Sequence, residues 1–297
     1  MECVRPLIAL DFGVNPDTKK HKLKILPKRV DSSISSLKEK YGDSSVVLLP
    51  CGKCLPCRMN YANSWGVKCL LESLYHRQSS FVTLTFSDEH LPSSVQDLKR
   101  EFQLFIKRLR GRGFKCRYFG CGERGETGDR FHLHIILFGV WLDDFKYRCQ
   151  SGGIAHYSSL TLQDLWNNQG IVDIEPFCFQ NARYTASYCV RSEKKTAFVL
   201  CSKKPPIGYQ YFLDHKNEIY EFDKIYGNFG NSYSVKPPRS FDQWCEKIDF
   251  DIRKIKESRS NLSKIIKNQE LISSSVSYED LLLRLKAETL KSKMNRR

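Results

Sequence analysis

The 297-residue sequence lacks several features that would assign it to common classes of protein. It has no run of the roughly 18–20 apolar residues that a membrane-spanning helix needs, which excludes an integral membrane protein. The apolar stretch near its N-terminus is broken by Asp11 and is too short for a signal peptide, so we expect a protein that is not secreted. No GxxxxGK[ST] loop occurs, which excludes a P-loop motor. No repeat is visible at periods of 20 to 50 residues, which argues against a solenoid.

Positive charge, in contrast, is in excess. The chain has 48 Lys and Arg residues against 33 Asp and Glu residues, a formal net charge of +15. These basic residues cluster in residues 19–29, in residues 99–117 and in the last 47 residues. Such clusters favour an acidic partner, most often nucleic acid, because they neutralise phosphates and release counterions. A well-solvated basic surface is the alternative.

The hydrophobic pattern predicts an α+β fold around a mostly antiparallel sheet flanked by helices. Hydrophobic residues make up 41% of the chain and aromatic residues 12%, enough for a packed core. Alternating apolar residues predict strands, and apolar stripes such as Leu98, Phe102, Phe105 and Leu109 predict helices. The expected strands are 81–86, 115–121, 131–138 and 171–175, and the expected helices are 61–76, 95–109, 159–167, 181–195, 241–257, 261–271 and 278–293.

Three regions follow from composition. We expect residues 1–45 to form a basic, irregular arm with one short strand near Pro6–Leu10. Residues 46–205 would form the main domain, which ends at two consecutive prolines that stop any helix. Residues 206–297 combine a tyrosine-rich stretch with a basic helical C-terminal region.

Two histidines on one predicted strand point to a metal site. His132 and His134 are two residues apart, so their side chains project from the same face of the strand. Glu123 ends the preceding strand of a predicted hairpin, which would bring it beside them as a third ligand. The alternative is two polar residues on a solvated strand face.

Two tyrosines on one predicted helix point to nucleophilic chemistry. Tyr184 and Tyr188 are four residues apart and therefore neighbours on one helix face. A tyrosyl oxygen can attack phosphorus and form a phosphotyrosine, which divides strand cleavage and rejoining into two steps. A metal ion would stabilise the developing charge on the phosphodiester. A stripe of aromatic core residues is the alternative.

The twelve cysteines include one regular group. Cys51, Cys54 and Cys57 form a CxxCxxC pattern, whose spacing lets successive thiolates surround one ion. We favour structural zinc over an iron–sulfur cluster or three free thiols. The candidates for a fourth ligand are Cys69, and after it His76, Cys116 and Cys121.

The order of these motifs resembles the HUH endonucleases, specifically the replication initiators of gokushovirus-type microviruses. The resemblance rests on PCGKCLPCR, FVTLTFSDEHLP, GERG with HLHIILFG, and RYTASY followed by KK, over about half the chain. It implies an HUH-type core in which His132, His134 and Glu123 bind Mg²⁺ or Mn²⁺. Tyr184 and Tyr188 would become linked to a DNA 5′-phosphate. The sequence departs from the family pattern at Ser187, where a lysine is common, and in the later position of its lysine pair.

The resemblance therefore implies a site-specific DNA endonuclease that starts rolling-circle replication of a small phage genome in the host cytoplasm. It would nick one strand of DNA at an origin, on single-stranded or supercoiled circular substrates, and later rejoin it. Host helicase and polymerase would be its partners. The alternatives are a non-enzymatic zinc-containing DNA-binding accessory protein, and an HUH transposase or relaxase. The residues expected to contact DNA are Lys107, Arg108, Arg110, Arg183, Arg191, Lys194 and Lys195.

Overall fold

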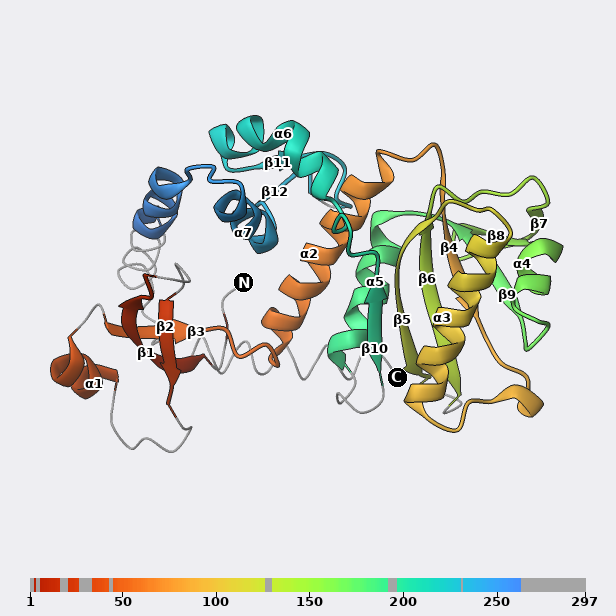
Figure 1. Cartoon of the computed structure of the whole chain (residues 1–297), viewed down its shortest axis with the longest axis horizontal. Coiled ribbons are helices and arrows are strands. Elements are labelled where there is room, and N and C mark those ends of the chain that lie inside the picture. Colours follow the sequence, from red (N-terminus) through yellow and green to blue (C-terminus); the bar gives the residue numbers. More distant parts are fainter. Residues whose placement is uncertain are drawn as a thin grey trace. The chain divides into compact units, whose positions relative to one another are not determined.

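The computed structural model of the chain (Figure 1) describes residues 3, 6–16, 21–26, 34–42, 45–125, 130–191, 197–230 and 232–262. These residues fall into two compact units. The first is formed by the described residues up to Asn60, and the second by those from Tyr61 onward. Helix α2 (Leu55–Ser73) contributes residues to both units. None of the helices in the described ranges is long and apolar enough to cross a membrane.

The first unit contains a three-stranded antiparallel sheet and one helix, where the sequence predicted an irregular arm. The strand expected near Pro6–Leu10 is present as part of β1, but the described residues around it form further strands and a helix, so the prediction of an irregular arm is wrong. The strands pair in the order β2-β1-β3, so the central strand β1 also pairs with β3, which follows it in the sequence only after β2 and α1. Such non-local pairing leaves little trace in a local pattern, and all five residues of β2 are exposed. The elements are β1 (Leu7–Val14), β2 (His21–Ile25), α1 (Ile34–Tyr41) and β3 (Val46–Leu49).

The second unit is built on a seven-stranded sheet in the order β10-β5-β6-β4-β9-β8-β7. Every neighbouring pair of strands is antiparallel, which confirms the predicted α+β class with an antiparallel sheet flanked by helices. The strands are β4 (Ser79–Leu84), β5 (Arg117–Arg124), β6 (Phe131–Phe138), β7 (Lys146–Ser151), β8 (Ile154–Ser158), β9 (Val172–Pro176) and β10 (Phe198–Cys201).

The helices of this unit include several that the sequence predicted and one that it did not. The tyrosine-rich stretch, which had no predicted helix, forms α6. Most of the predicted helix 261–271, and all of 278–293, lie outside the described residues. The remaining elements are η2 (Asp88–His90), α3 (Val95–Gly111), α4 (Leu160–Leu165), α5 (Phe179–Arg191), α6 (Tyr209–Phe222), β11 (Ile225–Tyr226), β12 (Ser234–Val235) and α7 (Arg239–Lys247), followed by helical residues 253–262.

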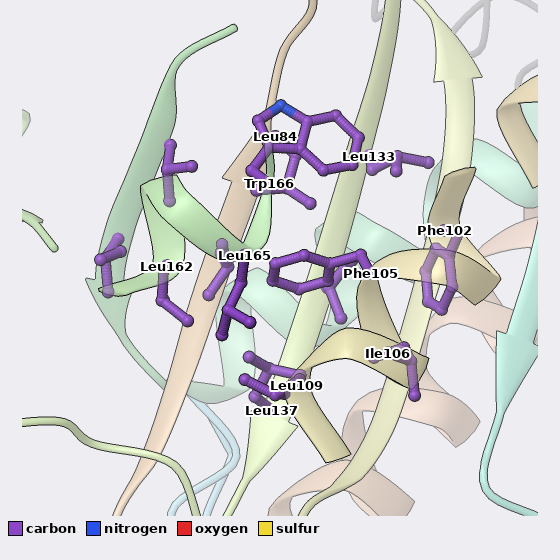
Figure 2. Close-up of a cluster of buried hydrophobic side chains, with 14 of the residues drawn as sticks. Leu84, Phe102, Phe105, Ile106, Leu109, Leu133, Leu137, Leu162, Leu165 and Trp166 are labelled. Carbon is purple, nitrogen blue, oxygen red and sulfur yellow. The ribbon is translucent and has the colours of Figure 1, made fainter. Parts of the chain in front are cut away.

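Helices α3 and α4 cover one face of the large sheet. Figure 2 shows apolar side chains of these helices and of Trp166, which follows α4, meeting side chains of the central strands such as Leu84 and Leu133. All of these side chains are fully buried. Close approach of α3 depends on Gly120 of β5, because a Cβ there would lie 2.7 Å from the Phe102 ring.

Helices α2 and α5 cover the opposite face. Because alternate residues of a strand point to opposite sides, Ile136 and Phe138 face α5, whereas Leu133 and Leu137 face α3. The two helices also meet each other closely at Gly66, where a Cβ would lie 2.6 Å from Cγ of Arg183. This packing determines where α5, the helix that contains the paired tyrosines, lies on the sheet.

Candidate active site and metal centres

The predicted hairpin is present and aligns the three proposed ligands. Strand β5 pairs with β6 in a register that places Glu123 directly opposite His132 and Cys121 opposite His134. Glu123, His132 and His134 therefore project from the same sheet face, the one that α5 covers. Glu123 and His134 are each only 7% exposed, and His134 Nε2 lies 3.3 Å from Glu123 Oε1.

The imidazole of His134 is held on both sides. Its Nδ1 lies 3.1 Å from Oγ1 of Thr83 on the neighbouring strand β4, while its Nε2 faces Glu123. The ring also stacks on Phe81, with the centroids 5.7 Å apart. Two hydrogen-bond partners and an aromatic neighbour thus fix the ring plane and direct Nε2 toward the carboxylate.

His132 lies beside this pair without closing a three-ligand group. The rings of His132 and His134 are nearly parallel, with centroids 6.5 Å apart. Burial lowers the pKa of His132 and the neighbouring His134 lowers it further, so the imidazole is neutral and able to act as a ligand at neutral pH. Its donor atom is, however, not part of a group within 4.8 Å of both other ligands among the described residues.

The paired tyrosines meet the same histidine. The ring of Tyr188 stacks on His134 with centroids 5.4 Å apart, and Tyr184 contacts His134 edge-on at 5.6 Å. The hydroxyl of Tyr188 donates a hydrogen bond to the hydroxyl of Tyr184. Ala182 and Ala186, on the buried side of α5, hold the helix against the sheet. The structure therefore brings both predicted nucleophiles to the predicted metal-ligating face.

The donor set fits a hard divalent cation. An imidazole nitrogen and a carboxylate oxygen 3.3 Å apart are close to the spacing of about 3 Å expected for adjacent ligands of an octahedral ion with bonds near 2.1 Å. His134 and Glu123 would hold such an ion, with Thr83 orienting His134 through the other ring nitrogen. His132 is the nearest additional nitrogen donor on this strand face.

A second candidate metal centre lies in the first unit. The sulfur atoms of Cys3, Cys51, Cys54 and Cys57 all lie within 4.8 Å of one another. Cys54 Sγ is 3.7 Å from Cys3 Sγ, close to the edge of about 3.8 Å expected for tetrahedral zinc with Zn–S bonds of 2.3 Å. The backbone N–H groups of Lys53 and Cys54 donate to Cys51 Sγ at 3.4 and 3.3 Å. Four thiols at this spacing match a closed structural zinc site.

Two of these thiols, Cys51 and Cys57, have pKa values that are shifted in opposite directions. Burial acts to raise the pKa of Cys51, but the two backbone N–H donors bring it down to about 6. Burial and a hydrogen bond with Cys54 raise the pKa of Cys57 to about 12. A bound zinc ion takes up thiolates, so its binding would release protons from this cluster.

Cys69 lies outside this cluster, so the expectation that it supplies the fourth ligand is wrong, and Cys3 takes that place. Twelve residues of helix α2 separate Cys57 from Cys69, about 18 Å along the helix axis. Cys69 is fully buried against Phe81 and Phe119, and burial raises its pKa well above the ordinary value, so it stays a neutral thiol. The other candidates, His76, Cys116 and Cys121, are outside the cluster as well.

Comparison with known proteins identifies the family. A family model for replication-associated proteins of the ORF2 type matches residues 79–193. The replication-associated protein ORF2 of Spiroplasma virus 4 is 30% identical over 258 residues, covering 79% of this chain and 80% of that protein. The chain belongs to the replication-associated proteins of microviruses. The resemblance seen in the sequence is confirmed.

Two further replication-associated proteins of phages are similar to the chain, one over slightly more of it and one over less. The replication-associated protein VP4 of Bdellovibrio phage phiMH2K is 29% identical over 83% of this chain and 78% of its own length. The replication-associated protein ORF4 of Chlamydia phage 1 is 28% identical over 67% of this chain and 54% of its own length. No solved structure matches the chain. Membership places the protein in phage DNA replication.

The expected DNA contacts of helix α3 lie on the other face of the sheet in this family member. Lys107 is exposed, and Arg110 lines a pocket with His76, Lys115 and Arg117. Arg108 instead donates from Nε to the Leu165 carbonyl at 2.6 Å, which ties α3 to α4. The structure thus separates Lys107 and Arg110 from the tyrosines. It also gives both Arg108 and Arg110 a hydrogen bond to a backbone carbonyl within the protein.

Of the other expected DNA contacts, Arg183 directly precedes Tyr184 in the sequence, and the rest follow Tyr188. The guanidinium of Arg183 lies over the Phe179 ring, 5.7 Å from its centroid, on the tyrosine helix. The backbone of Arg191 ends α5, but its side chain is outside the described part of the structure. Lys194 and Lys195 also lie outside the described residues.

Sequence reasoning missed three features of these sites. Cys3 stands 48 residues before Cys51, so spacing does not link it to the CxxCxxC group. Thr83 has no signature of its own beyond its place on a strand. His156, Asp173 and Glu175 form another group of ligand atoms within 4.8 Å of one another. The alternation of Asp173 and Glu175 in VDIEP was the available signal, since it places both carboxylates on one strand face.

Proposed function

We propose that the chain initiates rolling-circle replication as a site-specific DNA endonuclease. It nicks one strand at the phage origin by metal-assisted tyrosyl transesterification, forms a 5′-phosphotyrosine link, and rejoins the strand after a round of synthesis. One observation supports the proposal above all. Two tyrosines from one helix, Tyr184 and Tyr188, contact an imidazole, His134, that is itself paired with a buried carboxylate, Glu123.

The proposed reaction exchanges one phosphate ester bond for another. The phenolic oxygen of one tyrosine forms a bond to the scissile phosphorus, and the bond from phosphorus to the 3′ oxygen breaks. The tyrosine loses its proton and the leaving 3′ oxygen gains one, so the products are a 5′-phosphotyrosine and a free 3′-hydroxyl. That hydroxyl can prime synthesis. Attack of a 3′-hydroxyl on the phosphotyrosine reverses the step, releases the tyrosine and reseals a strand.

Two adjacent tyrosines suit a cycle with two transfers. When the origin is copied, the second tyrosine can cut the new junction while the first still holds the displaced strand. The hydroxyls of Tyr184 and Tyr188 are hydrogen-bonded to each other, and both rings contact His134, which supports this role. The same phosphate position is therefore within reach of either.

The site would take Mg²⁺ or Mn²⁺. Such an ion supplies polarisation of the phosphodiester oxygens and stabilises the charge that develops on them. His134 and Glu123 are the residues that would hold it, with His132 as the third ligand. The hydroxyl of Thr83 orients His134, and the parallel rings of the two histidines keep both nitrogen donors on one face.

The cysteine cluster belongs to the same proposal as a structural element. Cys3, Cys51, Cys54 and Cys57 would hold zinc, because four thiolates leave no open position for catalysis. The substrates would be single-stranded and supercoiled circular DNA that contains the origin. Since the sequence has no P-loop, host helicase and polymerase would supply unwinding and synthesis, and the protein would act in the host cytoplasm.

Replacing both tyrosines tests the proposal. The protein would be incubated with Mn²⁺ and with supercoiled circular DNA or a labelled origin strand, then analysed by denaturing electrophoresis with and without protease. The wild type should give a shifted band that protease removes. The variant with Tyr184→Phe and Tyr188→Phe should give none, yet bind the same DNA with unchanged affinity, because phenylalanine keeps the ring contacts with His134.

A matched single variant sharpens the result. Tyr157→Phe removes a hydroxyl from a tyrosine that packs on the opposite face of the sheet and should leave the adduct intact. A covalent adduct in the double variant would show that the nucleophile lies elsewhere. Salt-sensitive DNA binding without any adduct in the wild type would instead favour a non-enzymatic accessory protein.

A further inference from the structure

The third group of ligand atoms has no part in the chemistry described so far. His156 lies on β8, and Asp173 and Glu175 lie two residues apart on β9, so both carboxylates point to the same sheet face. One oxygen or nitrogen of each side chain lies within 4.8 Å of the others. Asp173 pairs with Thr83, which pairs on its other side with His134. The group therefore shares a sheet face with His134 and the tyrosines.

The protein balances the charges in this group only in part. His156 Nδ1 lies 2.7 Å from Asp173 Oδ2, and Arg148 is 4.0 Å from the other Asp173 oxygen. Glu175 is partly buried, yet within the described ranges it has no hydrogen-bond or ion-pair partner. Two carboxylates side by side on one strand repel each other, and a partly buried carboxylate without a partner is costly. A cation between them would remove both costs.

We propose that His156, Asp173 and Glu175 form a second divalent-cation site, which takes Mn²⁺ or Mg²⁺. A neutral imidazole and two carboxylates supply a charge of −2, which matches a divalent ion. The separation of 2.7 Å between His156 and Asp173 is close to the spacing of about 3 Å of adjacent octahedral ligands. Three protein ligands leave further coordination positions open toward the face that the tyrosines share.

This site is independent of the one at His134. Two-metal centres that act on a single phosphate hold their ions about 3.5–4 Å apart. Here the backbones of Asp173 and His134 are separated by two strand spacings, about 10 Å, with β4 between them. The second ion is therefore suited to a different phosphate of the bound strand, an assignment that rests on the proposed DNA-nicking function.

Counting bound manganese tests the site directly. The full-length protein, with its zinc already loaded, would be titrated with Mn²⁺ while electron paramagnetic resonance records the free ion. The wild type should bind two ions per chain. The variant with Asp173→Asn and Glu175→Gln should bind one, and so should the variant with His132→Ala and His134→Ala. Glu221→Gln, which changes an exposed carboxylate elsewhere, should bind two.

The outcomes distinguish a failure of the proposed second cation site from a failure of the proposed nicking-site metal. If the wild type binds one ion and only the histidine variant loses it, the second site is wrong and the nicking site stands. If the only ion is lost in the Asp173 and Glu175 variant, the second site stands and the proposed nicking-site metal is wrong. Thermal unfolding of each variant checks folding, and Glu175→Gln alone, a nearly isosteric change, should also lose the ion.

DNA binding tests whether the open coordination positions of the second ion contact a DNA phosphate. In the background of Tyr184→Phe and Tyr188→Phe, which prevents cleavage, Mn²⁺ should tighten binding of a single-stranded oligonucleotide by roughly tenfold. The added changes Asp173→Asn and Glu175→Gln should remove most of that gain. An unchanged effect of Mn²⁺ would overturn the contact between this ion and a DNA phosphate.

Discussion

Thr83 is the residue whose side chain most directly controls the candidate metal ligand. Its hydroxyl lies 3.1 Å from His134 Nδ1, opposite the nitrogen that faces Glu123. Replacing Thr83 with valine keeps the branched shape and removes the hydroxyl. Because such outer partners fix the ring orientation of a metal-bound histidine, we expect Thr83→Val to weaken Mn²⁺ binding at this site by about 10- to 100-fold. Mn²⁺ titration, with the Asp173 and Glu175 site removed, measures this affinity.

A positioning role for Thr83 predicts rescue as well as loss. Thr83→Ser keeps the hydroxyl and should restore Mn²⁺ affinity to within a few fold of wild type, even though it removes a methyl group from the sheet. A purely structural role predicts the reverse order, with serine the more damaging change because valine preserves packing. Equal affinity in the valine variant and the wild type would show that His134 is held by Glu123 and Phe81 alone.

At the residue scale, local spacing predicted what lies within one or two adjacent elements. Tyr184 and Tyr188 meet because they are one helical turn apart, and Glu123 meets the histidines because a hairpin joins their strands. The roles of Cys3 and Thr83 could not be predicted from local spacing, because their partners are 48 and 51 residues away in the sequence. Contacts of that range depend on how strands pair, which a local pattern does not encode.

The same distinction holds for whole elements. Strand β6 has the predicted bounds, because FHLHIILF is an apolar run interrupted only by His132 and His134 and is almost entirely buried. The hairpin β7–β8 was not predicted because all six residues of β7 are exposed. The strand therefore lacks the alternation of apolar and polar residues by which a half-buried strand is recognised. Helix α6 was not predicted because tyrosines and phenylalanines occur on several of its faces. The buried stripe of Phe212, Ile219 and Tyr220 therefore does not stand out in the sequence.

The cysteine loop offers a prediction at this scale. If Cys3 completes a zinc site with the CxxCxxC loop, Cys3→Ser should lower zinc content from one ion per chain to well below half after dialysis against a mild chelator. Thiolate zinc sites contribute folding energy, so the first unit should also melt at a lower temperature. Mass spectrometry of the metal content, together with thermal unfolding followed by circular dichroism, measures both effects.

Two other cysteines are the controls for that experiment. Cys149 is exposed, and Cys149→Ser should keep the full zinc content. Cys69 is buried in the core of the second unit, so Cys69→Ala should lower stability through a small cavity and still keep zinc. Loss of zinc in the Cys69 variant, with retention in the Cys3 variant, would restore the ligand set first expected from the sequence.

At the scale of the whole molecule, the chain has a net charge of +15, and the exposed basic residues in its described part lie on more than one element. Lysines 22 and 24 are exposed on strand β2, while Lys107 and Arg110 lie on the helix that covers the sheet face away from the tyrosines. If the proposed scissile phosphate lies at the tyrosines and α3 also contacts DNA, a single strand must pass around the sheet. We therefore expect mutations to separate DNA binding from cleavage.

Removing the α3 charges tests this separation. We expect the variant with Lys107→Gln and Arg110→Gln to bind single-stranded origin DNA more weakly, and its slope of log K against log salt to fall by about 1.4, since each lost phosphate contact removes about 0.7. Arg112→Gln is the matched control, because Arg112 forms an ion pair with Asp164 at 2.5 Å, whereas Arg110 donates to the neutral carbonyl of Cys116. At saturating DNA, the yield of the tyrosyl adduct should equal that of wild type in both variants. An unchanged salt slope, or an adduct lost at saturation, would mean that the DNA path keeps to the tyrosine face or that α3 takes part in the reaction itself.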